Sequence, residues 1–293
     1  MKLFITGASS VLGKALTSEL LKTNKASIRL LEHHRALPKG QCEIYRGDIQ
    51  DFDFLVKACS GIDIVFHMAA VTHSSSARPY FEVNENGTDR LIAACQKNNV
   101  KRIIFVSSSA ASKEGGSYAV SKLRGEKLVR ESGLEWVILR ISEVYGPNLD
   151  EGIAKLMLCV KTRPVVPVIG NGRYLLSPVH VDDVVRAMAA VLEHYSGKND
   201  TLYLCGPEKI TMNELISRLA LIQNLKQKTI FVPLWLAKIV IKLMEFLKPG
   251  VVVSDQIPRL LCKKEYSIVH TQALITYNPR RLEEGVLSFS HNQ

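Results

Sequence analysis

The feature that most constrains the fold is a short apolar run at the N-terminus that leads directly into a glycine-containing turn. Residues 3–5 read Leu-Phe-Ile, and residues 6–13 read Thr-Gly-Ala-Ser-Ser-Val-Leu-Gly. An amphipathic helical pattern follows over residues 14–22, and a second apolar run occupies residues 27–31. Strand, glycine turn, helix and strand in this order form one βαβ unit, which indicates a parallel sheet.

The same alternation continues along the first half of the chain. We predict further strands at 42–45, 62–67, 102–106 and 136–140, and helices at 52–59, 83–98 and 118–131. Repeated alternation of this kind is typical of an α/β protein in which helices cover both faces of a parallel sheet.

After Pro147 the rhythm changes to loops and shorter elements. A capping box at 211–214 predicts a helix to about residue 220, and residues 234–247 form the most apolar predicted helix. Its polar residues Lys238, Lys242 and Glu245 follow one another at helical spacing. We expect this helix to pack on the second region of the protein rather than to act as an interfacial membrane anchor.

Composition narrows the class of protein. Of 293 residues, 46% are hydrophobic and 23% charged, which excludes a disordered chain, a collagen or a coiled-coil rod. The net charge of +10 permits acidic ligands, but no basic run is dense enough to indicate a nucleic acid partner. No stretch approaches the roughly 18 apolar residues of a transmembrane helix, so we expect no integral membrane segment.

The six cysteines, at 42, 59, 95, 159, 205 and 262, form no CxxC pair. We interpret them as reduced thiols of an intracellular protein, and we predict no metal site. The N-terminus lacks the apolar stretch of a signal peptide. Together these observations predict a cytoplasmic protein.

The glycine turn predicts a cradle for a phosphate group, because backbone N–H groups and the positive end of a helix dipole would face the anion. The residue between the two glycines that would normally also be glycine is Ser10. The alternative is a tight turn that binds no ligand. In a dinucleotide site, the contacts would come from the turn and the first helical residues: Gly7, Ser9, Ser10, Val11, Leu12 and Gly13.

Glu32 follows the second predicted strand, 19 residues after Gly13. An acidic residue there can bind both ribose hydroxyls and repel a 2′-phosphate, which favours NAD. Arg35 could hold that phosphate instead, so NADP remains open. Asp48, followed by Ile49, ends the third strand near the expected adenine, and its alternative role is a helix N-cap.

Tyr118 and Lys122 stand four residues apart, on one face of a predicted helix. We expect the ammonium to lower the phenol pKa from about 10 toward neutral pH, which would make Tyr118 a usable acid and base. A helix can also carry such a pair by chance.

Several further motifs accompany this pair. They are Ser107-Ser108-Ser109 at a strand end, His67-Met68-Ala69-Ala70, the segment 83–88, Val144-Tyr145-Gly146-Pro147 and His180-Val181-Asp182-Asp183. With the glycine turn, their order and spacing resemble the extended short-chain dehydrogenase/reductase family, the NAD-dependent epimerase/dehydratases. The resemblance covers nearly the whole length of the chain.

The resemblance implies a Rossmann-type, doubly wound domain over residues 1–165, which also receives part of 174–208, and a smaller substrate-binding region over 166–293. It implies that Tyr118 exchanges a proton with the substrate oxygen, that Lys122 holds the nicotinamide ribose, and that Ser109 hydrogen-bonds the substrate. Ser107 and Ser108 would mainly support the strand end, and His67 would be a hydrogen-bonded buried histidine. Further cofactor contacts would come from Met68, Ala69, Ala70, Asn84 and Ser107, together with Tyr118 and Lys122 themselves.

Two departures from the family pattern bear on the substrate. Nucleotide-sugar epimerases usually have Asn where this chain has Glu143, and Arg where it has Leu176. The candidate substrate contacts are Glu143, Arg173 and His180. Arg173 lies three residues before Leu176 and is out of register, and His180 belongs to a motif that is mainly structural. A diphosphate needs cationic or hydrogen-bonding partners, and both expected ones are missing.

We therefore predict an NAD(P)-dependent oxidoreductase that acts on a secondary alcohol or ketone of small size. The alternatives are a nucleotide-sugar 4-epimerase or dehydratase, and a non-catalytic subunit that binds a dinucleotide for assembly or sensing. The resemblance also implies a homodimer formed through the helices at 83–98 and 118–131.

Overall fold

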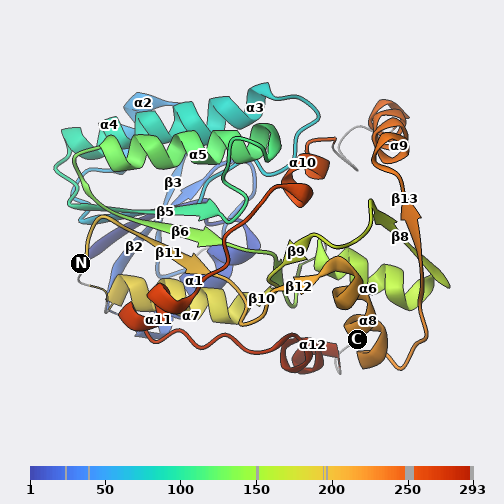
Figure 1. The fold of residues 1–293 in the computed structure, drawn as a ribbon. Helices are drawn as coiled ribbons and strands as arrows, with labels where there is room; N and C mark the ends of the chain where they lie inside the picture. The colour runs from blue at the N-terminus through green and yellow to red at the C-terminus, as the bar shows by residue number, and fades with distance from the viewer. Residues whose placement is uncertain are drawn as a thin grey trace.

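The computed structural model describes residues 1–23, 25–38, 40–149, 152–193, 195, 197–247 and 254–290. At its centre lies a seven-stranded sheet in the order β11-β6-β5-β4-β1-β2-β3, with every neighbouring pair parallel (Figure 1). The strands are β1 (Lys2–Thr6), β2 (Ser27–Glu32), β3 (Glu43–Arg46), β4 (Ile64–His67), β5 (Arg102–Ser108), β6 (Glu135–Ile141) and β11 (Asp200–Leu204).

Helices cover both faces of the sheet, which confirms the doubly wound α/β fold (Figure 1). One face carries α2 (Phe52–Ala58), α4 (Gly87–Lys97) and α5 (Gly116–Glu131). The other carries α1 (Val11–Thr23) and α7 (Val181–Glu193), while α11 (Val269–Leu274) lies against the edge strand β11, where the Thr271 hydroxyl bonds the backbone of Tyr203. Each layer buries its own hydrophobic core against the sheet, since the β strands present fully buried side chains on both faces.

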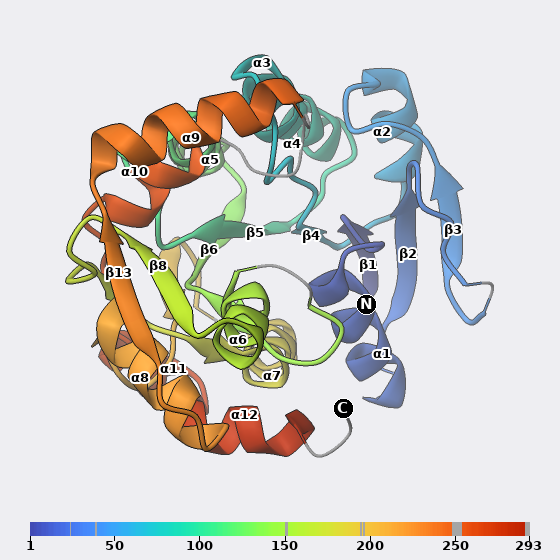
Figure 2. The ribbon, with the colours of Figure 1, turned by 90° about the vertical axis from the view of Figure 1, so that its right-hand side faces the viewer.

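The second region lies beyond the carboxyl ends of the strands (Figure 2). Its core is shared by α6 (Ile153–Thr162), β8 (Val165–Ile169), α8 (Met212–Ile222) and α12 (Leu282–Ser290). Short strands complete it: β7 (Val144–Tyr145) with β10 (Val179–His180), β9 (Leu175–Leu176) with β12 (Ile210–Thr211), and β8 with β13 (Lys228–Val232). Because α6 packs on α8, we propose that this region begins at α6 rather than at residue 166.

The helix predicted over 83–98 is split in the structure. A three-residue turn α3 (Arg78–Tyr80) and a π-helix η1 (Phe81–Asn86) precede α4. Asn84 explains the wider turn, since its amide donates to the Val71 carbonyl and to Ser121, while its oxygen accepts from the Val71 N–H. These bonds draw the helix wall toward the loop that follows β4.

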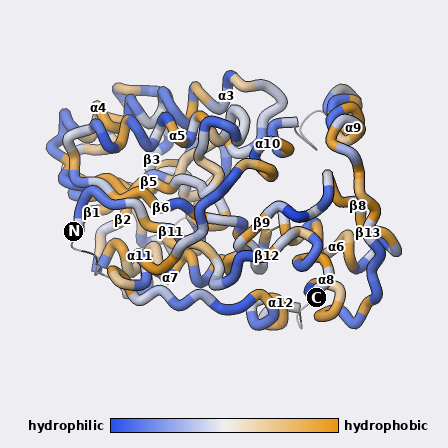
Figure 3. The backbone as a smooth tube through the Cα atoms, viewed as in Figure 1, coloured by the Kyte–Doolittle hydropathy of each residue, from blue (hydrophilic) through white to orange (hydrophobic). Residues whose placement is uncertain are grey.

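Helix α9 (Leu234–Leu247) corrects a prediction. We expected it to pack on the second region, but of its residues whose side chains are described only Ala237 is buried. The helix lies at the margin of the molecule (Figure 3). No helix within the described residues is long and apolar enough to cross a membrane. The expected helix at 211–220 is found as α8, and Thr211 and Glu214 form its capping box.

Candidate active site

The glycine turn joins β1 to α1 at the carboxyl edge of the sheet, and both glycines are required there. Gly7 has φ +73°, and a Cβ on it would lie 2.7 Å from the backbone of Met68 and Ala69. A Cβ on Gly13 would lie 2.4 Å from the carbonyl oxygen of Gly7. The turn therefore packs closely against the end of β4 at Gly7, and its two ends approach each other closely at Gly13, so neither position has room for a side chain.

Ser10 shows how the chain manages without the middle glycine. Its hydroxyl donates to the carbonyl of Gly7 at 2.9 Å and accepts from the N–H of Gly13 at 3.0 Å. The Ser10 side chain thus links the two ends of the turn by hydrogen bonds, which a glycine at this position could not do. It also satisfies one of the N–H groups that a helix leaves unpaired in its first turn.

The turn has the properties of a dinucleotide cradle. The N–H groups of Val11 and Leu12, at the start of α1, have no hydrogen-bond acceptor within the described residues. The end of β4 is fixed beside them, since the Thr6 hydroxyl accepts from the N–H groups of Met68 and Ala69. Close backbone approach and free helix N–H groups are what a pyrophosphate requires, so the residues present fit NAD.

Glu32 lies at the end of β2, and its carboxylate is already engaged. It accepts from the Leu37 N–H at 2.6 Å and from Arg46 Nε at 2.5 Å, and its side chain is only 6% exposed. The bonds from Leu37 and Arg46 hold the pKa of this carboxyl below its usual range, against the effect of burial. The cation paired with Glu32 is thus Arg46, which sequence reasoning missed and whose own side chain is 75% exposed.

Asp48 and Ile49 flank the same corner. The Asp48 carboxylate accepts from the Gln50 N–H and lies 3.4 Å from His33. It caps no helix, because the N-cap of α2 is Asp51. Ile49 is buried against the first residue of α4, Gly87.

Tyr118 lies in the first turn of α5 and is 9% exposed. Burial raises the pKa of its phenol, while the positive charge of Arg259 and a hydrogen bond with the Ser108 side chain act in the opposite direction. We expected Lys122 to lower this pKa, and that expectation is wrong for the structure as it stands. The cation that lowers the pKa of the Tyr118 phenol instead comes from the C-terminal region.

The three serines at the end of β5 have different neighbours. We predicted that Ser109 contacts the substrate and that Ser108 supports the strand end, and the Ser108 side chain is the one that lowers the pKa of the Tyr118 phenol. Ser109 donates its backbone N–H to the Ile141 carbonyl, which extends the sheet by one residue. Ser107 points to the other side and donates to the buried carboxylate of Glu126 at 2.6 Å.

Lys122 is 2% exposed and lies one turn further along α5. Its ammonium is 4.1 Å from the centre of the Phe105 ring. Burial lowers the pKa of Lys122 to about 7, although the carboxylate of Glu126 partly opposes the change. This amine can therefore gain or lose a proton near neutral pH.

A segment of the C-terminal region covers the start of α5, and no sequence motif predicts this contact. The Asp255 carboxylate accepts from the N–H groups of Ser117 and Tyr118, so it caps α5 from a distant part of the chain. Helix α10 (Gln256–Leu261) follows, and its Arg259 guanidinium lies over the Tyr118 ring while donating to the Thr72 carbonyl. A cavity of about 270 Å³ lies beside this contact, lined by Ser74, Tyr80, Ser117, Asp255 and Pro258 among others.

Glu143 stands where a substrate contact was predicted, but its carboxylate is neutralised inside the protein. Lys264 lies 2.8 Å away with only 4% of its side chain exposed. The Tyr266 hydroxyl and the Ser177 N–H also donate to this carboxylate. Burial, together with the negative charge of Glu143, raises the pKa of the Tyr266 phenol well above its usual range.

The remaining predicted residues divide between supporting roles and the surface. His67 is buried between the hydroxyls of Thr6 and Thr88, as expected, and burial lowers its pKa to about 3. Asp183 binds Arg280 and Arg186, which ties α7 to the C-terminal segment. Arg173 is exposed and His180 is buried against Tyr145, whereas Asn84 donates to Ser121, whose hydroxyl donates to the Tyr118 carbonyl. Among the described residues no group of His, Cys, Asp or Glu could hold a metal ion.

Comparison with known proteins points the same way as the geometry. The sequence model of the NAD dependent epimerase/dehydratase family matches residues 3–206. The chain is 27% identical to the UDP-glucose 4-epimerase of Vibrio cholerae, over 97% of this chain and 92% of that protein. It is 25% identical to the 4-hydroxy-2-methyl-3-oxo-4-farnesyl-3,4-dihydroquinoline-1-oxide ketoreductase of Stigmatella aurantiaca, over 89% of this chain and 84% of that protein.

Solved structures share the fold over nearly the whole chain. The UDP-glucuronic acid 4-epimerase of Bacillus cereus, in complex with UDP-glucuronic acid and NAD, superposes with a TM-score of 0.77 at 22% identity. The match covers 98% of this chain and 97% of that one. At this level of identity the likeness establishes the architecture.

Proposed function

The chain belongs to the NAD dependent epimerase/dehydratase family, and from that premise we propose that it oxidises or reduces a secondary alcohol or ketone that carries no nucleotide diphosphate. NAD would be held by the turn from Gly7 to Gly13 and by the end of β4. When bound, it supplies the hydride acceptor or donor. Every proton movement falls to the protein.

Tyr118 would handle the proton at the substrate oxygen. Oxidation of a secondary alcohol removes a hydride from carbon and a proton from oxygen, and reduction returns both. The phenol, whose pKa the Ser108 side chain lowers, can accept or give that proton. Lys122, whose pKa is about 7, can restore the protonation state of the site at neutral pH. Arg259 would stabilise the phenolate form by its charge.

The observation that carries the choice of substrate is the cluster around Glu143. A nucleotide diphosphate needs cations or donors at this edge of the second region. The Lys264 ammonium there is buried and paired with Glu143, and the neighbouring Leu176 is buried in the core of the second region. The charges of Glu143 and Lys264 thus neutralise each other, and this surface favours an uncharged ketone or alcohol.

A nucleotide-sugar 4-epimerase is the second candidate, because the Vibrio cholerae relative that covers nearly the whole chain is a UDP-glucose 4-epimerase. An epimerase keeps its cofactor between turnovers, whereas a dehydrogenase exchanges it. Mass spectrometry of the protein as purified therefore separates the two, with tightly held NAD favouring the epimerase.

The test of substrate class uses UDP-, GDP- and dTDP-sugars at millimolar concentration. We expect none to raise the melting temperature or to be converted, while a panel of small ketones yields NADH oxidation that Tyr118→Phe abolishes. Turnover of any nucleotide sugar would contradict the interpretation of Glu143. If Tyr118→Phe fully complements a deletion strain while Gly13→Val fails, the protein binds its cofactor without catalysis.

We also propose that the protein acts in the cytoplasm as a homodimer. The six cysteines are free in the structure, which fits a reducing compartment. The dimer rests on the resemblance to the family, and sedimentation velocity tests it.

A further inference from the structure

Helix α9 turns its apolar side away from the protein. Trp235, Ile239 and Leu243 follow one another at intervals of four residues and are 64%, 57% and 57% exposed. Ala237, which is buried, marks the opposite side of the helix. A surface helix of a globular protein normally buries its apolar stripe, so α9 has the reverse arrangement.

The apolar surface extends beyond these three side chains. Leu236, Val240 and Leu247 of α9 are exposed as well, and so are Ile230 and Phe231 of β13, the strand that leads directly into α9. Figures 2 and 3 show β13 and α9 following one another along the same side of the second region. Single exposed apolar residues are common, but a continuous surface of this kind marks a binding face.

The charges around this surface indicate what covers it. Lys238 and Lys242 are exposed and flank the apolar stripe on one side of α9. The acidic residue of the helix, Glu245, is drawn toward the protein, where its carboxylate accepts from the Ser254 N–H at 2.5 Å. Lys226 and Lys228, at the start of β13, are exposed too.

We propose that α9 and β13 form a membrane-docking surface that lies in the interface of an anionic bilayer. An apolar stripe bordered by lysines is the pattern of helices that rest at this depth, with the ammonium groups reaching the lipid headgroups. A second copy of the chain would be a poorer occupant of this face, because a two-fold contact through α9 would bring Lys238 and Lys242 of the two copies close together. At about 21 Å, α9 is also too short to span a bilayer, which agrees with a helix lying along the surface.

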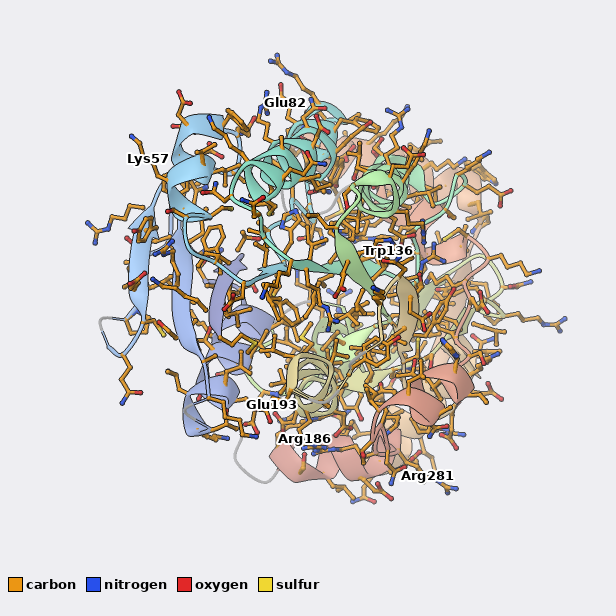
Figure 4. All side chains as sticks on the ribbon, turned by 90° about the vertical axis from the view of Figure 1, so that its left-hand side faces the viewer. Lys57, Glu82, Trp136, Arg186, Glu193 and Arg281 are labelled. Carbon is orange, nitrogen blue, oxygen red and sulfur yellow. The ribbon has the colours of Figure 1, made fainter. Side chains whose placement is uncertain are left out.

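The chain provides its own reporter for a test. It contains two tryptophans, and Trp136 lies on the side opposite to α9 (Figure 4). A Trp136→Phe variant leaves Trp235 as the sole tryptophan. When phosphatidylcholine vesicles containing phosphatidylglycerol are added, we expect Trp235 emission to shift to shorter wavelength and to be quenched by brominated acyl chains. Flotation of the wild-type protein with the same vesicles gives an independent measure.

Two sets of variants separate the apolar and the charged contributions. Ile239→Glu combined with Leu243→Glu should abolish flotation. Lys238→Glu combined with Lys242→Glu should weaken it roughly tenfold or more on anionic vesicles. The matched control is Leu221→Glu on α8, since Leu221 is 76% exposed but lies outside α9 and β13, and it should float like the wild type. Circular dichroism and NADH binding check that each variant is folded.

Three results would overturn the proposal. They are a wild-type protein that does not float, a Leu221→Glu control that loses binding as completely as the α9 variants, and a dimer in sedimentation velocity that the α9 variants dissociate without any binding to vesicles. The last would show that α9 joins two copies of the chain. None of these measurements depends on the substrate of the enzyme.

Discussion

The guanidinium of Arg259, on α10, lies 4.7 Å from the ring centre of Tyr118, on α5. Its positive charge lowers the pKa of the phenol, which burial alone would raise. The proposed acid/base group is thus adjusted by a residue of the second region. Helix α10, which packs on the start of α5, therefore also sets the electrostatic environment of this phenol.

The first prediction concerns this pair. Arg259→Met should raise the pKa of Tyr118, so the limb of the pH profile on which alcohol oxidation increases should move to higher pH. Arg259→Lys should restore part of the shift, because it retains the charge. The measurement is kcat/KM against pH, with Arg163→Met as a control for loss of an exposed arginine. An unchanged profile would show that Arg259 does not act on the phenol.

The second prediction distinguishes two adjacent serines. Ser108→Ala removes the hydroxyl that lowers the pKa of Tyr118 and should lower kcat about tenfold to a hundredfold with little change in cofactor affinity. Ser109→Ala keeps the backbone bond to Ile141 and should have the smaller effect. Steady-state kinetics of the two variants decide the assignment. A larger loss in Ser109→Ala would restore the original prediction from the sequence.

The third prediction contrasts Tyr118 with Lys122. Tyr118→Phe removes one oxygen and keeps the ring, so catalysis should fall by ~10²–10⁴ while NADH binding survives. Lys122→Met should weaken both, because the amine is expected to hold the nicotinamide ribose. Calorimetric titration of NADH and turnover assays are compared on the same preparations. Equal NADH affinity in both variants would remove Lys122 from the cofactor site.

The fourth prediction follows from the burial of Lys122, whose pKa falls from 10.5 to about 7 in the folded chain. Between these values the unfolded chain holds a proton that the folded chain has lost, so this residue makes the protein more stable as the pH rises. Lys122→Met should therefore be more stable than the wild type at about pH 6, and its advantage should shrink toward pH 10. Urea unfolding without cofactor measures the difference. A constant difference would mean that Lys122 titrates normally.

The fifth prediction concerns cofactor preference. Arg46 is ion-paired with Glu32. Glu32→Ala should therefore free the Arg46 guanidinium to bind a 2′-phosphate, which would narrow the preference for NADH over NADPH. Adding Arg46→Ala should cancel the gain in NADPH affinity, whereas adding Arg35→Ala should leave it. Calorimetry with both cofactors provides the test. If Arg35→Ala is the change that cancels the gain, the exposed loop after β2 holds the phosphate.

Local sequence determined six of the seven strands of the sheet, the glycine turn and the Tyr118–Lys122 pair, whereas β11 was not predicted. Strand and helix periodicity depend on neighbours a few residues apart, and so do the close approach at Gly7 and the spacing of two residues on one helix face. For these reasons the strands β1 to β6 and the helices α2, α5 and α8 lie where the pattern predicts them within a few residues. The family resemblance then supplied the roles that spacing alone could not.

Contacts between distant parts of the chain decided the rest. Arg259 reaches Tyr118, Asp255 caps α5, Lys264 neutralises Glu143 and Arg46 binds Glu32, and none of these partners shares a local pattern with the residue it meets. A pKa depends on burial and on every charge nearby, so the altered pKa of Tyr118 could not be obtained from Lys122 alone. Likewise, periodicity showed that α9 has an apolar face, but only the packing of the whole chain decided that this face would be left uncovered.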